Sequence, residues 1–164
     1  MSETLFHGPA AIFSECERFR YTLTRRWSDG DGFVQFIGLN PSTATATQDD
    51  PTVRRCVNFA KAWGYDGMIM TNLFAFRATD PRQMKAHPVP VGPNNDMWLL
   101  RVARAVQQIV CCWGQHGTFL NRANDVETVL GGFRLSCLRA STGEPHHPLY
   151  LPKTLRPIDW ARQL

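Results

Sequence analysis

Four short polar segments hold the side chains of this chain that are best suited to chemistry. The segments are Asn40-Pro41, Asn72, Trp113-Gly114 and His146-His147. An asparagine amide has both donors and acceptors and can pair with the edge of a nucleobase, whereas a neutral imidazole can donate a hydrogen bond to a developing oxyanion. The first three segments end apolar stretches. If those stretches are parallel strands, their ends and the histidines are expected to meet in one crevice.

The elements that must position these segments alternate between strand and helix patterns. Apolar, β-forming stretches predict strands over residues 20–27, 33–38, 67–73, 108–113 and 133–138. Helical spacing, capping residues and glycine stops predict helices over residues 51–63, 80–86, 92–106 and 118–130. Alternation of this kind favours a parallel sheet with helices on its faces.

We therefore predict an α/β fold with three layers, α/β/α, around a central, mostly parallel, four-stranded sheet. An N-terminal strand or hairpin is expected beside this sheet, because a turn at residues 29–32 could join residues 20–27 to residues 33–38. The tail after residue 140 is rich in proline and is expected to be mostly loop.

The bulk composition is that of one soluble globular domain spanning residues 1–164, with 43% hydrophobic and 20% charged residues. Lys and Arg exceed Asp and Glu by 18 − 14 = 4, a mild basic excess that suits a nucleic-acid or phosphate partner without requiring one. The five cysteines form no C-x-x-C pair, so we predict no disulfide, no metal site and no other cofactor. Reduced thiols favour a cytoplasmic protein. The chain lacks an apolar run long enough to span a membrane, and we expect a monomer with no membrane contact.

The order of the polar segments resembles that of the uracil-DNA glycosylase superfamily over about residues 33–151. The GLNP segment is similar to its first motif, and the resemblance implies that Asn40 orients the attacking water. Asn72 falls on the position that reads the base edge. The IVCCWG segment resembles an apolar strand ending in Trp-Gly, here Trp113-Gly114. His147 and the proline after it resemble the opening of the last motif. The resemblance implies a glycosylase-like sheet with Asn40 and His147 as catalytic residues.

Along its whole length the chain also resembles a bacterial family of unknown function, DUF1643. The segments that carry this second resemblance are GLNPSTA, DPTVRR, TNLF and WG, and it implies no activity. The chain departs from the glycosylase pattern at two places. Asn40 replaces an aspartate base, and Leu149-Tyr150 replace small polar residues of the last motif. Because an amide cannot take a proton at neutral pH, a slow or substrate-restricted enzyme is expected.

Further candidates for substrate binding surround these segments. We predict that a phosphate binds near Arg54 or Arg55, at the start of the helix predicted over residues 51–63, and that the hydroxyl of Ser42 donates to its oxygens. His146 and Trp113-Gly114 are the remaining candidates. A capped helix with a solvated basic face, a surface histidine pair and a tryptophan in the core are the plain alternatives, as are turn and loop-anchoring roles for Asn40 and Asn72.

The hypothesis that follows is a nucleobase- or nucleotide-handling enzyme that hydrolyses an N-glycosidic bond. The substrate would be a base, natural or modified, in a nucleoside, a nucleotide or a nucleic acid, including single-stranded DNA. Two alternatives stay open. One is a non-catalytic nucleotide or nucleic-acid binding module, and the other is a transferase or hydrolase acting on a nucleotide-derived small molecule.

Overall fold

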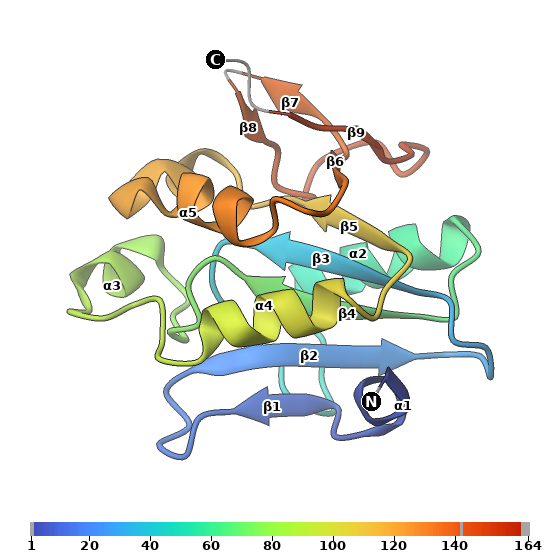
Figure 1. The fold of residues 1–164 in the computed structure, drawn as a ribbon, viewed down its shortest axis with the longest axis horizontal. Coiled ribbons are helices and arrows are strands. Elements are labelled where there is room, and N and C mark those ends of the chain that lie inside the picture. Colours follow the sequence, from blue (N-terminus) through green and yellow to red (C-terminus); the bar gives the residue numbers. More distant parts are fainter. Residues whose placement is uncertain (1, 142, 162–164) are drawn as a thin grey trace.

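The computed structural model describes residues 2–141 and 143–161, which form a mixed α/β fold around a seven-stranded sheet (Figure 1). In sheet order, the strands are β1 (Ala11–Phe13), β2 (Arg20–Arg26), β4 (Gly67–Asn72), β3 (Phe33–Gly38), β5 (Gln108–Cys111), β6 (Leu135–Cys137) and β9 (Ile158–Asp159). The short strands β7 (Ala140–Ser141) and β8 (Glu144–Pro145) pair separately. The helices are α1 (Ser2–His7), α2 (Pro51–Ala62), α3 (Pro81–Ala86), α4 (Asn95–Ala103), the 3₁₀ helix η1 (Gln115–Asn121) and α5 (Arg122–Val129).

The sheet is partly parallel. Strands β4, β3, β5 and β6 run parallel to one another, while β2 and β9 flank them in antiparallel orientation and β1 extends the β2 edge. The four parallel strands coincide with four predicted strands. The predicted count of four strands is nevertheless too small for the whole sheet, because antiparallel strands continue it on both sides.

The predicted hairpin between residues 20–27 and 33–38 is wrong. Strand β2 pairs with β4 and β1, whereas β3 lies between β4 and β5. The intervening turn is held by Asp66, whose carboxylate accepts a hydrogen bond from Gly32 N at 2.9 Å and whose own N–H donates to Gly32 O at 2.7 Å. Asp66 directly precedes β4, so this anchor brings β4 between the two strands that were expected to pair.

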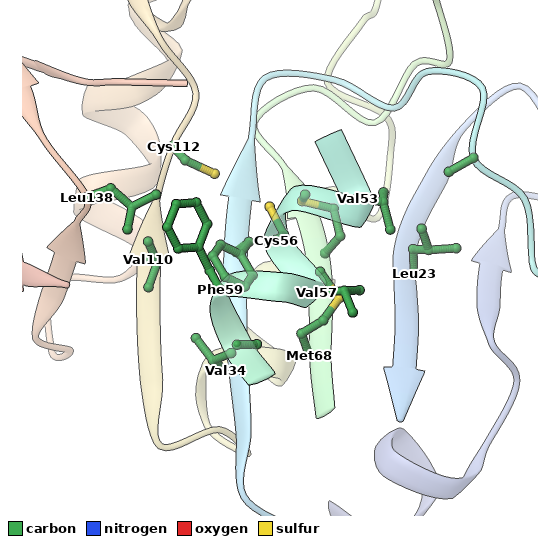
Figure 2. Close-up of a cluster of buried hydrophobic side chains, with 14 of the residues drawn as sticks. Leu23, Val34, Val53, Cys56, Val57, Phe59, Met68, Val110, Cys112 and Leu138 are labelled. Carbon is green, nitrogen blue, oxygen red and sulfur yellow. The ribbon is translucent and has the colours of Figure 1, made fainter. Parts of the chain in front are cut away.

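Helices cover both faces of the sheet. Val34 and Phe36 of β3 pack with α2 in one core cluster, whereas Ile37 of the same strand packs in another cluster with α4 and α5. Successive strand residues point to opposite faces, so the clusters lie on opposite sides. Figure 2 shows Val53, Cys56, Val57 and Phe59 of α2 directed at the strands beneath them. Both faces of the sheet are thereby covered by helices.

The sequence predicts the starts of α2 and α3 most accurately, and both follow an aspartate N-cap. Asp50 and Asp80 each accept a backbone N–H in the first turn, of α2 and α3, as expected for an N-cap. The helix predicted over residues 118–130 is instead divided, because Leu120 and Asn121 adopt positive φ angles of 53° and 57° that end η1 before α5 begins. Helix α4 is shorter than the predicted 92–106, β6 is shorter than 133–138, and the tail contains β7, β8 and β9 in addition to loop. No helix among the described residues is long and apolar enough to cross a membrane.

One edge of the sheet collects the ends of several strands. The carboxyl ends of β3, β4 and β5 lie there because these strands are parallel. The amino end of β2 lies there too, because β2 runs the other way: Arg20 N donates to Ala75 O, just beyond β4, at 2.9 Å. Residues that precede an antiparallel strand and residues that follow parallel ones therefore share this edge.

Candidate functional site

A cavity of about 370 Å³ lies at this edge of the sheet. Its lining includes six residues that the sequence singled out: Asn40, Ser42, Asn72, Trp113, Gly114 and His147. They come from four separate segments, and the ends of β3, β4 and β5 bring three of those segments together. The predicted convergence on one crevice is confirmed by this lining. The cavity volume is within the range typical of small-molecule sites, about 300–1,000 Å³.

Asn72 is the most unusual residue of the cavity. Its side chain is 4% exposed, and its Nδ2 is buried without a hydrogen-bond partner. The carboxamide lies over Gly38 of the neighbouring strand: a Cβ added at Gly38 would stand 2.9 Å from Asn72 Oδ1. A buried amide donor without an acceptor costs free energy. An acceptor supplied by a ligand would satisfy it.

Asn40 is half-buried at the end of β3 and is held firmly. Its Nδ2 donates to Ala78 O at 2.8 Å and to Pro41 O at 3.0 Å, so both amide protons are used on the backbone. Because two carbonyl oxygens require donors, the orientation of this amide is fixed by its surroundings. The remaining functional atom is Oδ1, which can accept a hydrogen bond from water but cannot take its proton.

His147 stands exposed at the rim of the cavity. Leu149 N donates to His147 Nδ1 at 3.3 Å, so Nδ1 is the acceptor and the proton of the neutral ring resides on Nε2. Loss of hydration at this rim lowers the pKa of His147 below its usual value of 6.5, while the negative charge of Asp50 partly offsets this. The lowered pKa favours the neutral ring of His147, whose Nε2–H can donate to a ligand.

Arg20 and Asp50 carry charged side chains into the lining of the cavity, and neither was predicted from the sequence as a site residue. Arg20 is 2% exposed, and its Nη1 donates to Ala44 O at 2.8 Å. Burial lowers the pKa of Arg20 to about 10, against the opposing effect of Asp50. Asp50 caps α2 by accepting from Val53 N at 2.8 Å, and it also accepts from Ala44 N at 3.3 Å. A signal for Arg20 was present, since an arginine begins an otherwise buried strand pattern.

The other predicted cavity residues have mixed environments. Ser42 lines the cavity and is half-buried. Trp113 also touches it but is 1% exposed, and its Nε1 donates to Glu144 Oε2 at 2.8 Å, which fits the core-packing alternative. Gly114 has a positive φ of 74° and lies against the His147 Cβ. His146 lines an adjoining hollow rather than the cavity itself.

Arg54 and Arg55 lie outside the cavity. Both line a separate, open hollow together with Lys153. Arg55 Nη2 donates to Leu151 O, and its guanidinium stacks over the Phe59 ring at 5.5 Å from the centroid. The phosphate site predicted at these arginines is therefore not part of the cavity that holds Asn72 and His147. The face of α2 that borders the cavity carries Thr52 and Val53 instead.

Within the described part of the chain, no group of three His, Cys, Asp or Glu side chains could hold a metal ion. The polar side chains that line the cavity are amides, hydroxyls, imidazoles, one guanidinium and one carboxylate. Their combined ability is hydrogen bonding and charge stabilisation of an organic ligand.

Comparison with known proteins gives a family but no activity. No curated protein and no solved structure was found to match the chain. One family model, described as Protein of unknown function (DUF1643), matches residues 20–149. All residues that line the cavity fall within this segment, which begins at Arg20 and ends at Leu149. Because the match covers most of the chain and the whole cavity, the protein belongs to the DUF1643 family.

Proposed function

We propose that the cavity binds a nucleobase and that the protein hydrolyses the N-glycosidic bond of that base. The observation that carries the proposal is the buried, unpartnered Nδ2 of Asn72. An amide with an unused donor in a cavity of this size suits the edge of a base, which offers carbonyl and ring-nitrogen acceptors. The base would belong to a nucleoside, a nucleotide or a nucleic acid.

The two rim residues would share the chemistry. Cleavage of an N-glycosidic bond places negative charge on the departing base, and the Nε2–H of His147 would donate to it. Asn40 Oδ1 would accept from a water and hold it against the sugar. Such a water is positioned without being deprotonated, so we expect slow turnover or a substrate whose base is already a good leaving group.

The sheet supports a glycosylase-like arrangement in this proposal. Four parallel strands with helices on both faces present Asn40, Asn72 and His147 in the order that the uracil-DNA glycosylase superfamily uses. We propose on this basis a three-layer sandwich of that kind. A base within duplex DNA would have to be rotated out of the helix to reach the cavity, so single-stranded or modified DNA is the simpler polymeric substrate.

A non-catalytic binding module is the second candidate, and the state of Asn40 favours it. Both of its amide protons are bound to backbone carbonyls, and the carboxylate that lines the cavity, Asp50, already accepts two backbone N–H groups. Neither group is free to act as a strong base. A module that only recognises a base would need Asn72 but not a base catalyst.

Single-turnover cleavage distinguishes the two candidates. Wild type, Asn72→Ala and His147→Ala would be mixed with oligonucleotides containing uracil, hypoxanthine and alkylated bases, and with the matching nucleosides and nucleotides. We expect release of at least one base, a loss of about 10²–10³-fold in His147→Ala, which is typical of one oxyanion donor, and blurred base preference in Asn72→Ala. Binding without release of any base would leave the binding module, and absence of both would refute the proposal.

A further inference from the structure

Arg20 is a buried cation whose guanidinium is only partly hydrogen-bonded. It is among the largest fully enclosed side chains of the protein, at 2% exposed, and it lines the cavity. A guanidinium carries five N–H donors. One of them reaches Ala44 O, while the Nε of Arg20 is buried without any partner. A buried cation is normally paired and fully hydrogen-bonded.

The neighbouring carboxylate does not supply that pairing. Asp50 lines the same cavity, yet no ion pair joins it to Arg20 among the described residues. The oxygens of Asp50 instead accept from Val53 N and Ala44 N. Burial consequently lowers the pKa of Arg20 to about 10 despite the nearby negative charge. The positive charge of Arg20 is left short of a direct partner.

Anchoring of the loop at residues 42–50 is the plain alternative role, and another arginine performs it. Arg25 of the same strand donates to Thr45 O at 2.6 Å and to two further carbonyls of the loop, and its Nε pairs with Asp49 at 2.7 Å. Arg25 does this near the surface and does not line the cavity. The loop therefore has a strong anchor that does not require a buried guanidinium.

A second residue of the same cavity also has a buried donor without a partner, the Nδ2 of Asn72 described above. Arg20 and Asn72 are brought close by the antiparallel pairing of β2 with β4, which sets the start of one strand beside the end of the other. Two unsatisfied donors, one of them charged, would be satisfied together by a ligand that carries oxygen acceptors and a negative charge.

We propose that Arg20 binds an oxyanion of the ligand, a phosphate or a carboxylate, inside the cavity beside the base-reading amide of Asn72. The proposal rests on the base-binding function above and extends it by naming the charge of the substrate. A charge-assisted contact with an arginine contributes about 10- to 100-fold in affinity. A nucleoside monophosphate, or a base that carries a carboxylate, should therefore bind at least about 10-fold more tightly than its neutral counterpart.

The test compares neutral and anionic members of matched pairs by calorimetry and NMR. The probes are uridine against uridine 5′-monophosphate, inosine against its monophosphate, uracil against uracil-6-carboxylate, and inorganic phosphate alone. We expect the anionic member of at least one pair to be favoured in wild type, with the favoured pair telling phosphate from carboxylate. The preference, taken as the ratio of the anionic to the neutral affinity, should disappear in Arg20→Gln. It should persist in the matched control Arg25→Gln, where loosening of the loop at residues 42–50 weakens both members of a pair alike.

Several outcomes would overturn the inference. They are equal binding of neutral and anionic members, an unchanged preference in Arg20→Gln, or no binding of any anion. If Arg20→Gln does not fold, the Nε–H signal of Arg20 in the wild-type protein serves instead, and it must shift on titration with the anionic probe. If nucleosides and their anionic counterparts bind with equal affinity, the inference about Arg20 fails while the proposed base binding stands. If phosphate binding depends on Arg20 but no base is preferred, the proposed base binding fails while the inference about Arg20 stands.

Discussion

Replacement of Asn72 by leucine is expected to stabilise the unliganded protein while abolishing base binding. Leucine has nearly the same shape as asparagine, and the substitution removes a buried amide donor that has no partner. The desolvation cost of such a group is about 1–3 kcal/mol, and this cost disappears in the variant. For a domain of this length each kcal/mol shifts the midpoint of thermal unfolding by about 2–4 °C, so a rise of roughly 2–12 °C is expected.

Asn95, the first residue of α4, offers a matched control. Asn95 is fully buried, and its Nδ2 donates to Asn72 O at 2.9 Å and to Leu73 O at 3.0 Å. Asn95→Leu removes both bonds, but Leu73 O keeps its bond from Arg122 Nε at 2.8 Å, and the unpartnered Oδ1 of Asn95 disappears with the side chain. The free energy of unfolding should therefore fall by about 1 kcal/mol, less than two lost hydrogen bonds would give. Urea and thermal unfolding, followed by circular dichroism, measure whether each variant raises or lowers the free energy of unfolding. A fall in stability for Asn72→Leu would show that its amide is satisfied in solution and would refute the reasoning.

Three further predictions concern the same cavity. Gly38→Ala should weaken base binding, measured by calorimetry, because its Cβ would stand 2.9 Å from Asn72 Oδ1 and displace the side-chain amide. Asn40→Asp should lower the free energy of unfolding by about 2 kcal/mol at pH 7. The amide of Asn40 donates to two carbonyl oxygens, and a carboxylate in its place would have no proton to donate to them. That loss should shrink at pH 4, where a protonated aspartic acid can donate; equal loss at both pH values in urea unfolding would contradict it. Activity should stay level as the pH falls to 6.5 and decline only below it, because the pKa of His147 is lowered and its protonation at Nδ1 breaks the bond from Leu149 N. A decline centred above pH 6.5 would contradict this assignment.

The sequence predicts this site well wherever a polar residue follows a buried parallel strand. Asn40 and Asn72 are examples, because apolar β-forming stretches mark their strands and the strands are parallel neighbours. Arg20 was missed since it begins its strand instead of ending it, and only the antiparallel orientation of β2 carries that end to the site. Strand direction depends on pairing between distant segments, which local patterns do not contain.

The arginines of α2 illustrate a different limit of sequence reasoning. Arg54 and Arg55 are the fourth and fifth residues of a correctly predicted helix, and a helix start can bind anions. Side chains one position apart point about 100° apart around a helix, so a place near the helix start does not decide which side chains face a cavity. The packing of Val53 and Cys56 into the core sets that rotation, and it directs the two arginines to the outer hollow.

The hold of Arg25 on the loop at residues 42–50 has a consequence for the speed and strength of binding. Ordering a backbone residue costs about 1–2 kcal/mol in conformational entropy. Hydrogen bonds from Arg25 to Thr45 O, Ala46 O and Gln48 O fix this loop before any ligand arrives, so that entropy is lost during folding and not during association. A ligand entering beside this wall would meet a preformed surface, which favours binding without a slow conformational step.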